Sequence, residues 1–244
     1  MIRVGVLGAG GRMGSETCRA VDADDELELV ARLGRDDPLE TLVSARAAVA
    51  VEFTTPASVK ENVRFCLSHG IHCVVGATGL SDADLEDVRA WSRDGAANVL
   101  VAPNFALGAV LMMSFAAAAA RHFDIAEIVE RHHERKLDAP SGTALRTARM
   151  MTEAREGRAW SSRSGDESVP GSRGGDSGGV RIHSLRVPGS VAHQEVVLGA
   201  AGETLTIRHD SIDRTSFMPG VVMAVKRAPG LDGLVVGLEN LLDL

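Results

Sequence analysis

The densest group of chemically capable side chains lies between residues 130 and 144. Two adjacent histidines, His132 and His133, are followed by Lys136 and then by Ser141-Gly142-Thr143. Histidine exchanges protons near neutral pH, and a lysine can donate a proton or hold an anion. Asp138 to Thr143 has the residue types of a helix start, where free N–H groups and hydroxyls suit a carboxylate. The segment therefore predicts proton transfer beside an anion-binding site.

Each of these residues also has an ordinary interpretation when taken alone. A single histidine is more often a surface or core residue than a catalytic one, and Ser141 could simply be an N-cap. A metal-binding histidine pair lacks carboxylate or cysteine partners at a recognisable spacing. Lys136, however, is one of three lysines in a chain with twenty-three arginines. Because a lysine can be tuned to release its proton and an arginine cannot, this choice favours a chemical role.

A glycine-rich loop directly follows the first apolar run. Residues 8–14, Gly-Ala-Gly-Gly-Arg-Met-Gly, satisfy both the G-x-G and the G-x-x-G-x-x-G spacings and lead into a helical pattern. Glycines allow the backbone to approach a pyrophosphate, which the helix N-terminus then stabilises. A tight glycine turn with no ligand is the alternative. The order of strand, turn and helix favours nucleotide binding.

The end of the second expected strand bears on which nucleotide is bound. An acidic residue there would hold the free ribose hydroxyls of NAD. This chain has Arg32, Gly34 and Arg35 at that point, with no carboxylate before Asp36. Arginines suit the 2′-phosphate of NADP, with Arg12 as a further candidate, although Arg32 and Arg35 could also be solvated surface charges.

The elements that would position the glycine loop alternate between short apolar runs and helical patterns. Such alternation predicts a parallel sheet with helices on both faces, and its loops meet at one ligand-binding edge. The expected strands are residues 2–7, 27–33, 48–53, 72–76 and 99–102, and the expected helices are residues 11–21, 57–69 and 81–94.

After residue 104 the pattern changes to that of a second domain. A small-residue helix through 116–120, a strand at 125–132 and a helix at 141–155 precede a long Gly- and Ser-rich loop at 158–179. Strands at 180–187, 192–198 and 204–208 then predict an open sheet, and residues 217–226 and 231–242 return to helical and apolar patterns. We expect one domain of residues 1–104 and 217–244 and another of residues 105–216.

Composition excludes several classes of protein. The net charge is −7 and the arginines are scattered, which argues against a nucleic-acid partner. We find no apolar run long enough to span a bilayer. The three cysteines, Cys18, Cys66 and Cys73, lie in apolar patterns and predict reduced thiols. The first residues have the pattern of a strand rather than a signal peptide, so we expect a cytoplasmic protein without a membrane partner.

The run from Glu130 to Ala144 resembles the signature of the 4-hydroxy-tetrahydrodipicolinate reductase family, also called dihydrodipicolinate reductase. The resemblance extends over essentially the whole chain. Further matching segments, in order, are residues 4–8, 53–56, 75–79, 102–105, 208–210 and 214–217. The family implies an α/β fold, with a Rossmann-like dinucleotide-binding domain and an α+β substrate and tetramerisation domain built on an open mixed sheet. It also implies a homotetramer.

The resemblance implies roles for individual residues. His132 would be the proton donor or acceptor and Lys136 a proton donor, with no metal. Substrate contacts would come from His133, Ser141, Gly142, Thr143 and Arg214. Cofactor contacts would come from Gly8, Ala9, Gly10, Gly11, Arg12, Met13, Gly76, Ala77, Thr78, Ala102, Pro103, Asn104 and Phe105, with Arg35 as a further candidate.

The implied reaction is NAD(P)H-dependent reduction of 4-hydroxy-tetrahydrodipicolinate, a dicarboxylate heterocycle, with loss of water, in the diaminopimelate route to lysine. Two positions depart from the family pattern. Gly34 stands where an acidic residue is common, which with Arg35 favours NADPH over NADH, and Ala77 stands where a threonine is common. The competing hypotheses are another Rossmann oxidoreductase acting on an amino or hydroxy acid, and a nicotinamide-sensing module. Neither explains the histidine pair together with Ser141-Gly142-Thr143.

Overall fold

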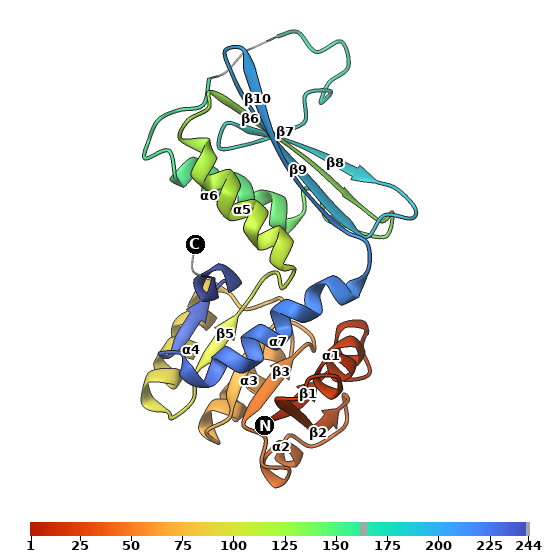
Figure 1. Cartoon of the computed structure of the whole chain (residues 1–244), viewed down its shortest axis with the longest axis vertical. Coiled ribbons are helices and arrows are strands. Elements are labelled where there is room, and N and C mark those ends of the chain that lie inside the picture. The colour runs from red at the N-terminus through yellow and green to blue at the C-terminus, as the bar shows by residue number, and fades with distance from the viewer. Residues whose placement is uncertain (162–164, 243–244) are drawn as a thin grey trace. The chain divides into compact units, whose positions relative to one another are not determined.

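The computed structural model describes residues 1–161 and 165–242. The chain forms two compact units (Figure 1), which are described separately here. Unit 1 comprises Met1–Leu107 and Arg214–Leu244, and unit 2 comprises Gly108–Asp213. Unit 1 is therefore built from both ends of the chain, and unit 2 from one continuous segment.

Unit 1 contains a six-stranded sheet in which every pairing is parallel. The spatial order is β11-β5-β4-β3-β1-β2, so the strand order reverses between β1 and β3. The central strands are short apolar runs buried along almost their whole length, as expected of a sheet covered on both faces. The strands are β1 (Ile2–Leu7), β2 (Leu27–Leu33), β3 (Val49–Glu52), β4 (His72–Val75), β5 (Val99–Val101) and β11 (Leu234–Val236).

Helices cover both faces of this sheet. On one face, apolar side chains of α2 (Glu40–Ser44), α3 (Val59–Ser68) and α4 (Asp82–Asp94) join the main hydrophobic core. On the other face α1 (Arg12–Asp22) contacts α7 (Met218–Arg227), as Figure 1 shows. Helix α4 begins at a complete capping box, in which Ser81 and Asp84 satisfy each other's backbone N–H groups.

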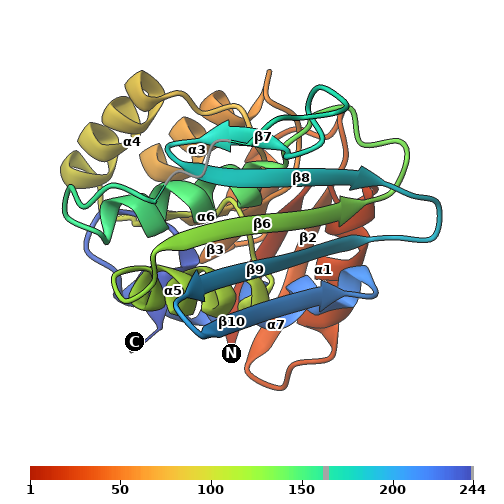
Figure 2. The same cartoon turned by 90° about the horizontal axis from the view of Figure 1, so that it is seen from above.

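Unit 2 is a five-stranded mixed sheet with helices on one face. The spatial order is β10-β9-β6-β8-β7; β6 and β8 are parallel and the other neighbours are antiparallel. Figure 2 shows α5 and α6 behind this sheet and no element in front of it. The elements are α5 (Leu107–Ala120), β6 (Ile125–His132), α6 (Gly142–Glu153), β7 (Gly175–Ser177), β8 (Val180–Arg186), β9 (Ala192–Ala200) and β10 (Glu203–Ser211).

Side-chain alternation along β6 separates the two faces of this second sheet. Ala126, Ile128 and Glu130 are buried on the helix-covered side, whereas Val129 is 36% exposed on the other. This period of two is the pattern of a strand with one covered face. Glu130, at 0% exposure, is the exception to an otherwise apolar inner row.

Each unit holds one of the chain's two tryptophans, and the sequence has no tyrosine. Trp91 of α4 packs in unit 1 with the Arg64 guanidinium 5.7 Å from its ring centre. In unit 2 the Arg155 guanidinium lies 3.9 Å from the ring centre of Trp160 and also donates to the carbonyls of Ala120 and Phe123. The latter contacts tie the end of α6 to the end of α5.

The expected fold class is confirmed, with three local differences. The tail at 231–242 has a strand, β11, which pairs with β5 instead of forming a helix. The expected loop at 158–179 includes β7, which pairs with β8, and its residues 162–164 lie outside the described part of the chain. The short helix α2 was not expected.

Candidate active site

The glycine loop of unit 1 packs too tightly for side chains at two of its positions. Gly8 has φ +75°, and a Cβ there would collide with the Phe53 carbonyl oxygen; at Gly14 it would collide with the Gly8 carbonyl. Gly10, by contrast, faces open space. Helix α1 then begins after Gly11 with no side-chain cap, so its first N–H groups remain available to an anion.

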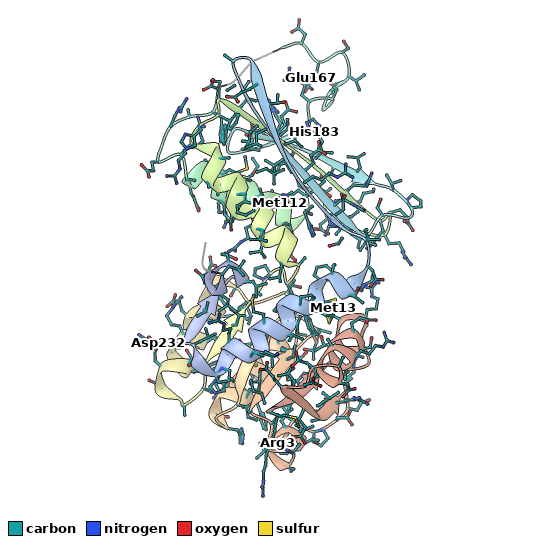
Figure 3. The ribbon with its side chains drawn as sticks, in the orientation of Figure 1. Arg3, Met13, Met112, Glu167, His183 and Asp232 are labelled. Atoms are coloured by element: carbon teal, nitrogen blue, oxygen red, sulfur yellow. The ribbon has the colours of Figure 1, made fainter. Side chains whose placement is uncertain are left out.

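A cavity of about 490 Å³ lies beside this helix start. Met13, labelled in Figure 3, is in the first turn of α1 and lines it. Its walls come from the loops after β1, β3 and β4, at the edge where a parallel sheet binds ligands. The lining residues are Gly11, Arg12, Met13, Phe53, Thr54, Gly76, Ala77 and Thr78.

The buried carboxylate of Glu52 fixes one wall of this cavity. It accepts hydrogen bonds from the Thr54 N–H at 2.8 Å, the Thr54 hydroxyl and the Asn62 amide at 3.0 Å. Burial raises the pKa of Glu52, although these neutral donors oppose the rise. Sequence reasoning did not single out Glu52.

The other expected cofactor residues lie around the cavity without lining it. Ala102 and Phe105 are buried, and the Phe105 ring meets the Phe53 ring edge to face at 5.8 Å. Rings of both phenylalanines would collide with a Cβ at Gly76. Asn104 accepts a hydrogen bond from the Ala106 N–H at 2.9 Å. The remaining residues of this set are Gly8, Ala9, Gly10 and Pro103.

The loop after β2 carries a carboxylate that the sequence did not suggest. Asp37 accepts a hydrogen bond from the Gly34 N–H at 2.7 Å and so closes the turn on itself. Arg32 pairs with Asp22 at 2.6 Å. Arg35 is exposed, and no carboxylate in the described part of the chain pairs with it.

In unit 2 the expected reactive residues lie around the end of β6 and the start of α6. His132 ends β6, and its Nδ1 lies 2.6 Å from Glu130 Oε2. Arg186 of β8 donates to both oxygens of the same carboxylate at 2.9 Å. The backbone N–H of Ser141 donates to Glu130 Oε1 at 3.1 Å. One buried carboxylate therefore joins the histidine to the helix start.

Burial alone would raise the pKa of Glu130, but hydrogen bonds from His132 and Arg186 outweigh it and lower the pKa to about 2. Glu130 is therefore ionised at neutral pH. The sequence contains a signal for this contact, since residues two apart on a strand share a face. Arg186 is 56 positions from Glu130 and has no such local signal.

The start of α6 is capped by Ser141 and open at Gly142. The Ser141 hydroxyl caps the helix by accepting from the Ala144 N–H at 3.2 Å. A Cβ at Gly142 would meet no atom within 4 Å, so a ligand has room to approach the backbone there. Thr143 follows in the first turn. This is the geometry expected of a carboxylate site.

The other two side chains of the motif have different surroundings. Lys136 holds both oxygens of Asp138 at 2.8 Å, and this hydrogen bonding lowers the pKa of Asp138. Nδ1 of His133 is buried without a hydrogen-bond partner among the described residues. Oε1 of Gln194 is also buried without a partner among the described residues. Gln194 is an inward-facing residue of β9 that the sequence did not single out.

Arg214 belongs to the other unit. It begins the 3₁₀ turn η1 (Arg214–Phe217), the first segment of the C-terminal part of unit 1, whereas His133 and residues 141–143 belong to unit 2. In the described ranges, no cluster of three or more His, Cys, Asp or Glu side chains could hold a metal ion. Nor does any described helix have the length and apolarity needed to cross a membrane.

Comparison with known families matches both halves of the chain. Residues 2–105 match the family described as "Dihydrodipicolinate reductase, N-terminus", and residues 108–242 match "Dihydrodipicolinate reductase, C-terminus". The chain belongs to the dihydrodipicolinate reductase family. Membership explains why the glycine loop and the His132 cluster occur together in one chain.

Individual members of the dihydrodipicolinate reductase family are similar over their full length. The chain is 54% identical to the 4-hydroxy-tetrahydrodipicolinate reductase of Streptomyces griseus subsp. griseus, covering 100% of this chain and 98% of the relative. It is also 54% identical to the 4-hydroxy-tetrahydrodipicolinate reductase of Nocardia farcinica, covering 100% of this chain and 99% of the relative. A dipicolinate-bound dihydrodipicolinate reductase structure from Paenisporosarcina sp. TG-14 aligns with a TM-score of 0.91 at 39% identity. The alignment covers 99% of this chain and 100% of that one.

Proposed function

We propose that this chain is a 4-hydroxy-tetrahydrodipicolinate reductase, which uses NAD(P)H to convert 4-hydroxy-tetrahydrodipicolinate to tetrahydrodipicolinate with loss of water, in the diaminopimelate route to lysine. The observation that carries the proposal is the shared carboxylate of Glu130, which joins a proton-transfer histidine to an anion-binding helix start. Full-length similarity to reductases of this name supports it. We place the activity in the cytoplasm.

The residues around the 490 Å³ cavity suit a nicotinamide dinucleotide. Open space at Gly10 and the uncapped N–H groups at the start of α1 fit a pyrophosphate. Residues 76–78 and 102–105 would complete the site, and the bound cofactor supplies the hydride. We further propose a preference for NADPH, because Arg35 is an exposed cation that no carboxylate among the described residues pairs with, and Asp37 is already bound to Gly34.

Most of the substrate contacts would come from unit 2. The N–H groups of Gly142 and Thr143 and the hydroxyls of Ser141 and Thr143 would bind one carboxylate, and His133 would be a further contact. Arg214, of unit 1, is the remaining proposed contact. A dihydrodipicolinate reductase with dipicolinate bound, a dicarboxylate, supports this ligand class. Hydride addition to C4 of an unsaturated imine leaves an electron-rich enamine that must gain a proton. His132 and Lys136 would supply that proton or assist loss of the hydroxyl as water.

We also propose that the enzyme is a homotetramer assembled through the uncovered face of the second sheet. Val129 and Leu185 are 36% and 41% exposed on this face. They line a shallow hollow with Arg131, whose Nε is buried without a partner among the described residues. Two exposed apolar side chains beside an unsatisfied donor, in a hollow otherwise lined by polar residues, fit a self-complementary contact with a second copy.

The activity is tested by following NAD(P)H oxidation after addition of freshly generated 4-hydroxy-tetrahydrodipicolinate. We expect turnover by the native chain, and a kcat lower by roughly 10²–10³ in His132→Gln, which is typical of losing an acid–base group. His122→Gln is the control, because His122 lies in the turn after α5 outside the proposed site. A native chain that does not oxidise either cofactor would contradict the proposal, and native turnover in His132→Gln would contradict the role of His132.

A further inference from the structure

Glu130 is the only carboxylate in the described part of unit 2 whose side chain is fully buried. A buried charge is costly unless it is paired and hydrogen-bonded. Oε2 faces His132 Nδ1 at 2.6 Å and Arg186 Nη1 at 2.9 Å. Oε1 accepts from Arg186 Nη2 at 2.9 Å and from the Ser141 N–H at 3.1 Å. The arrangement satisfies an ionised carboxylate and leaves it little freedom to move.

An ionised carboxylate determines which nitrogen of His132 can react. Because Glu130 Oε2 can only accept a hydrogen bond, Nδ1 must carry a hydrogen. Nε2 is then the nitrogen that exchanges a proton with a ligand.

The same carboxylate fixes the start of α6. Its Oε1 holds the N–H of Ser141, the N-cap residue of the helix. The position of His132 relative to the anion-binding turn is therefore set by a single side chain with two oxygens. A displacement of Glu130 would alter both groups at once.

We propose that Glu130 is a positioning residue for the reaction, which holds His132 in the tautomer with hydrogen on Nδ1 and fixes its place relative to the carboxylate-binding start of α6. This inference rests on the proposed reductase function for its kinetic consequences, but its structural part does not depend on turnover.

The charged groups near this contact come from three segments. Glu130 and His132 lie on β6, and Arg186 lies on β8. In the loop before α6, Arg186 also donates to the Asp138 carbonyl at 2.6 Å, and the Asp138 carboxylate is paired with Lys136. Ser184 adds a neutral donor to Glu130.

The kinetic test compares Glu130→Gln with Arg186→Gln. Glu130→Gln replaces a group that can only accept by an amide that can accept or donate, so both tautomers of His132 become possible and kcat should fall by roughly 10–100-fold. Arg186→Gln leaves the carboxylate facing His132 Nδ1, so kcat should fall less. A merely structural role would lower kcat by similar amounts in both variants.

The control is Glu28→Gln. Glu28 lies on β2 in unit 1 and accepts hydrogen bonds at 3.0 and 2.8 Å from Arg3, which is labelled in Figure 3. Because this carboxylate pairs with an arginine outside the proposed site, the kcat of the variant should match that of the native enzyme. A native-like kcat in Glu130→Gln would overturn the proposal.

The tautomer is measured directly by ¹⁵N NMR of histidine-labelled protein, with the His132 signals identified by their loss in His132→Gln. We expect hydrogen on Nδ1 in the native chain and a mixture of tautomers in Glu130→Gln. A native His132 with hydrogen only on Nε2 would overturn the inference even if the enzyme is active. An inactive native chain with hydrogen on Nδ1 would refute the proposed function alone.

Glu130→Gln leaves the Arg186 guanidinium without its carboxylate, which can prevent folding. The double variant Glu130→Gln with Arg186→Gln removes both charges and keeps hydrogen-bonding groups in the site. Its kcat should be as low as that of Glu130→Gln, and its His132 should show both tautomers. A single Nδ1–H tautomer in the double variant would show that Glu130 does not fix it.

Discussion

At the scale of single residues, Lys136 is distinguished by its partner as well as its rarity. It holds both oxygens of Asp138, so its ammonium group is fixed beside the start of α6. Lys60, which pairs with Asp84 and Asp87 on the surface of unit 1, is a lysine with a comparable double contact outside the proposed site. Lys60 therefore provides a control for the loss of an ion-paired lysine outside the proposed site.

Lys136→Met is expected to lower kcat by roughly 10²–10³, as expected for a proton donor. Lys136→Arg keeps the cation but cannot readily release a proton, so kcat should remain low while the KM for the substrate recovers. Steady-state kinetics of both variants, with Lys60→Met as the control, provide the measurement. Full recovery of kcat in Lys136→Arg would assign Lys136 a purely electrostatic role.

Arg35 is the residue on which the proposed NADPH preference depends. Arg35→Ala should lower kcat/KM for NADPH by about tenfold or more, since a close phosphate contact contributes roughly 1.5–3 kcal/mol, and should change kcat/KM for NADH little. Arg19→Ala is the control, because Arg19 is also exposed but pairs with Glu16 on α1. Equal loss with both cofactors would exclude recognition of the 2′-phosphate by Arg35.

The residues that sequence reasoning placed in the site are those carried by contiguous motifs. His132, Lys136 and residues 141–143 form one run, and the glycine loop another. Glu130 could have been found from the two-residue period of β6. Arg186 and Gln194 could not, because their places depend on the register of β8 and β9 with β6. Asp37 was overlooked because its role comes from a turn that brings it back to Gly34.

At the scale of elements, strong periodicity decided which parts of the fold could be predicted. The limits of β6 and β2 were predicted to the residue because each is a long run with buried positions. β11 has three residues and β7 consists of Gly, Asp and Ser, which have low strand propensity. These two strands exist because β5 and β8 offer them a pairing edge, which local sequence cannot reveal.

Two serine N-caps provide a test of what the α6 start does beyond stabilising a helix. Ser141 caps α6 in the proposed substrate site, and Ser81 caps α4 in unit 1. Ser141→Ala and Ser81→Ala should each lower the unfolding free energy by about 1 kcal/mol. Only Ser141→Ala should raise the KM for the dicarboxylate. Equal KM values in the two variants would indicate that Ser141 has no part in binding.

At the scale of the whole molecule, the two units contain fully buried glutamates with opposite pKa shifts. Glu130 in unit 2 is ion-paired and has its pKa lowered to about 2. Glu52 in unit 1 has only neutral partners, and burial raises its pKa. The stabilising contribution of Glu130 is present above its ordinary pKa of 4.5 and is lost as the pH falls toward about 2. The stabilising contribution of Glu52 is present below the ordinary pKa of a glutamate and is lost as the pH rises.

We therefore expect unit 2 to lose stability in acid, by on the order of 3 kcal/mol from Glu130. Denaturant unfolding between pH 2 and pH 8 measures the effect. Glu52→Gln should abolish the decrease in unfolding free energy that Glu52 causes as the pH rises. Glu130→Gln should abolish the decrease that Glu130 causes as the pH falls. An unchanged acid dependence in Glu130→Gln would place the acid-sensitive group elsewhere.

The placement of the aromatic residues makes these two transitions separately visible. Because the chain has no tyrosine, its intrinsic fluorescence comes from Trp91 in unit 1 and Trp160 in unit 2. Trp160 is 8% exposed beneath Arg155, so unfolding of unit 2 should shift its emission to longer wavelength and bring it within reach of iodide quenching. Trp91→Phe leaves an optical reporter of unit 2 alone, and Trp160→Phe one of unit 1, without any attached dye.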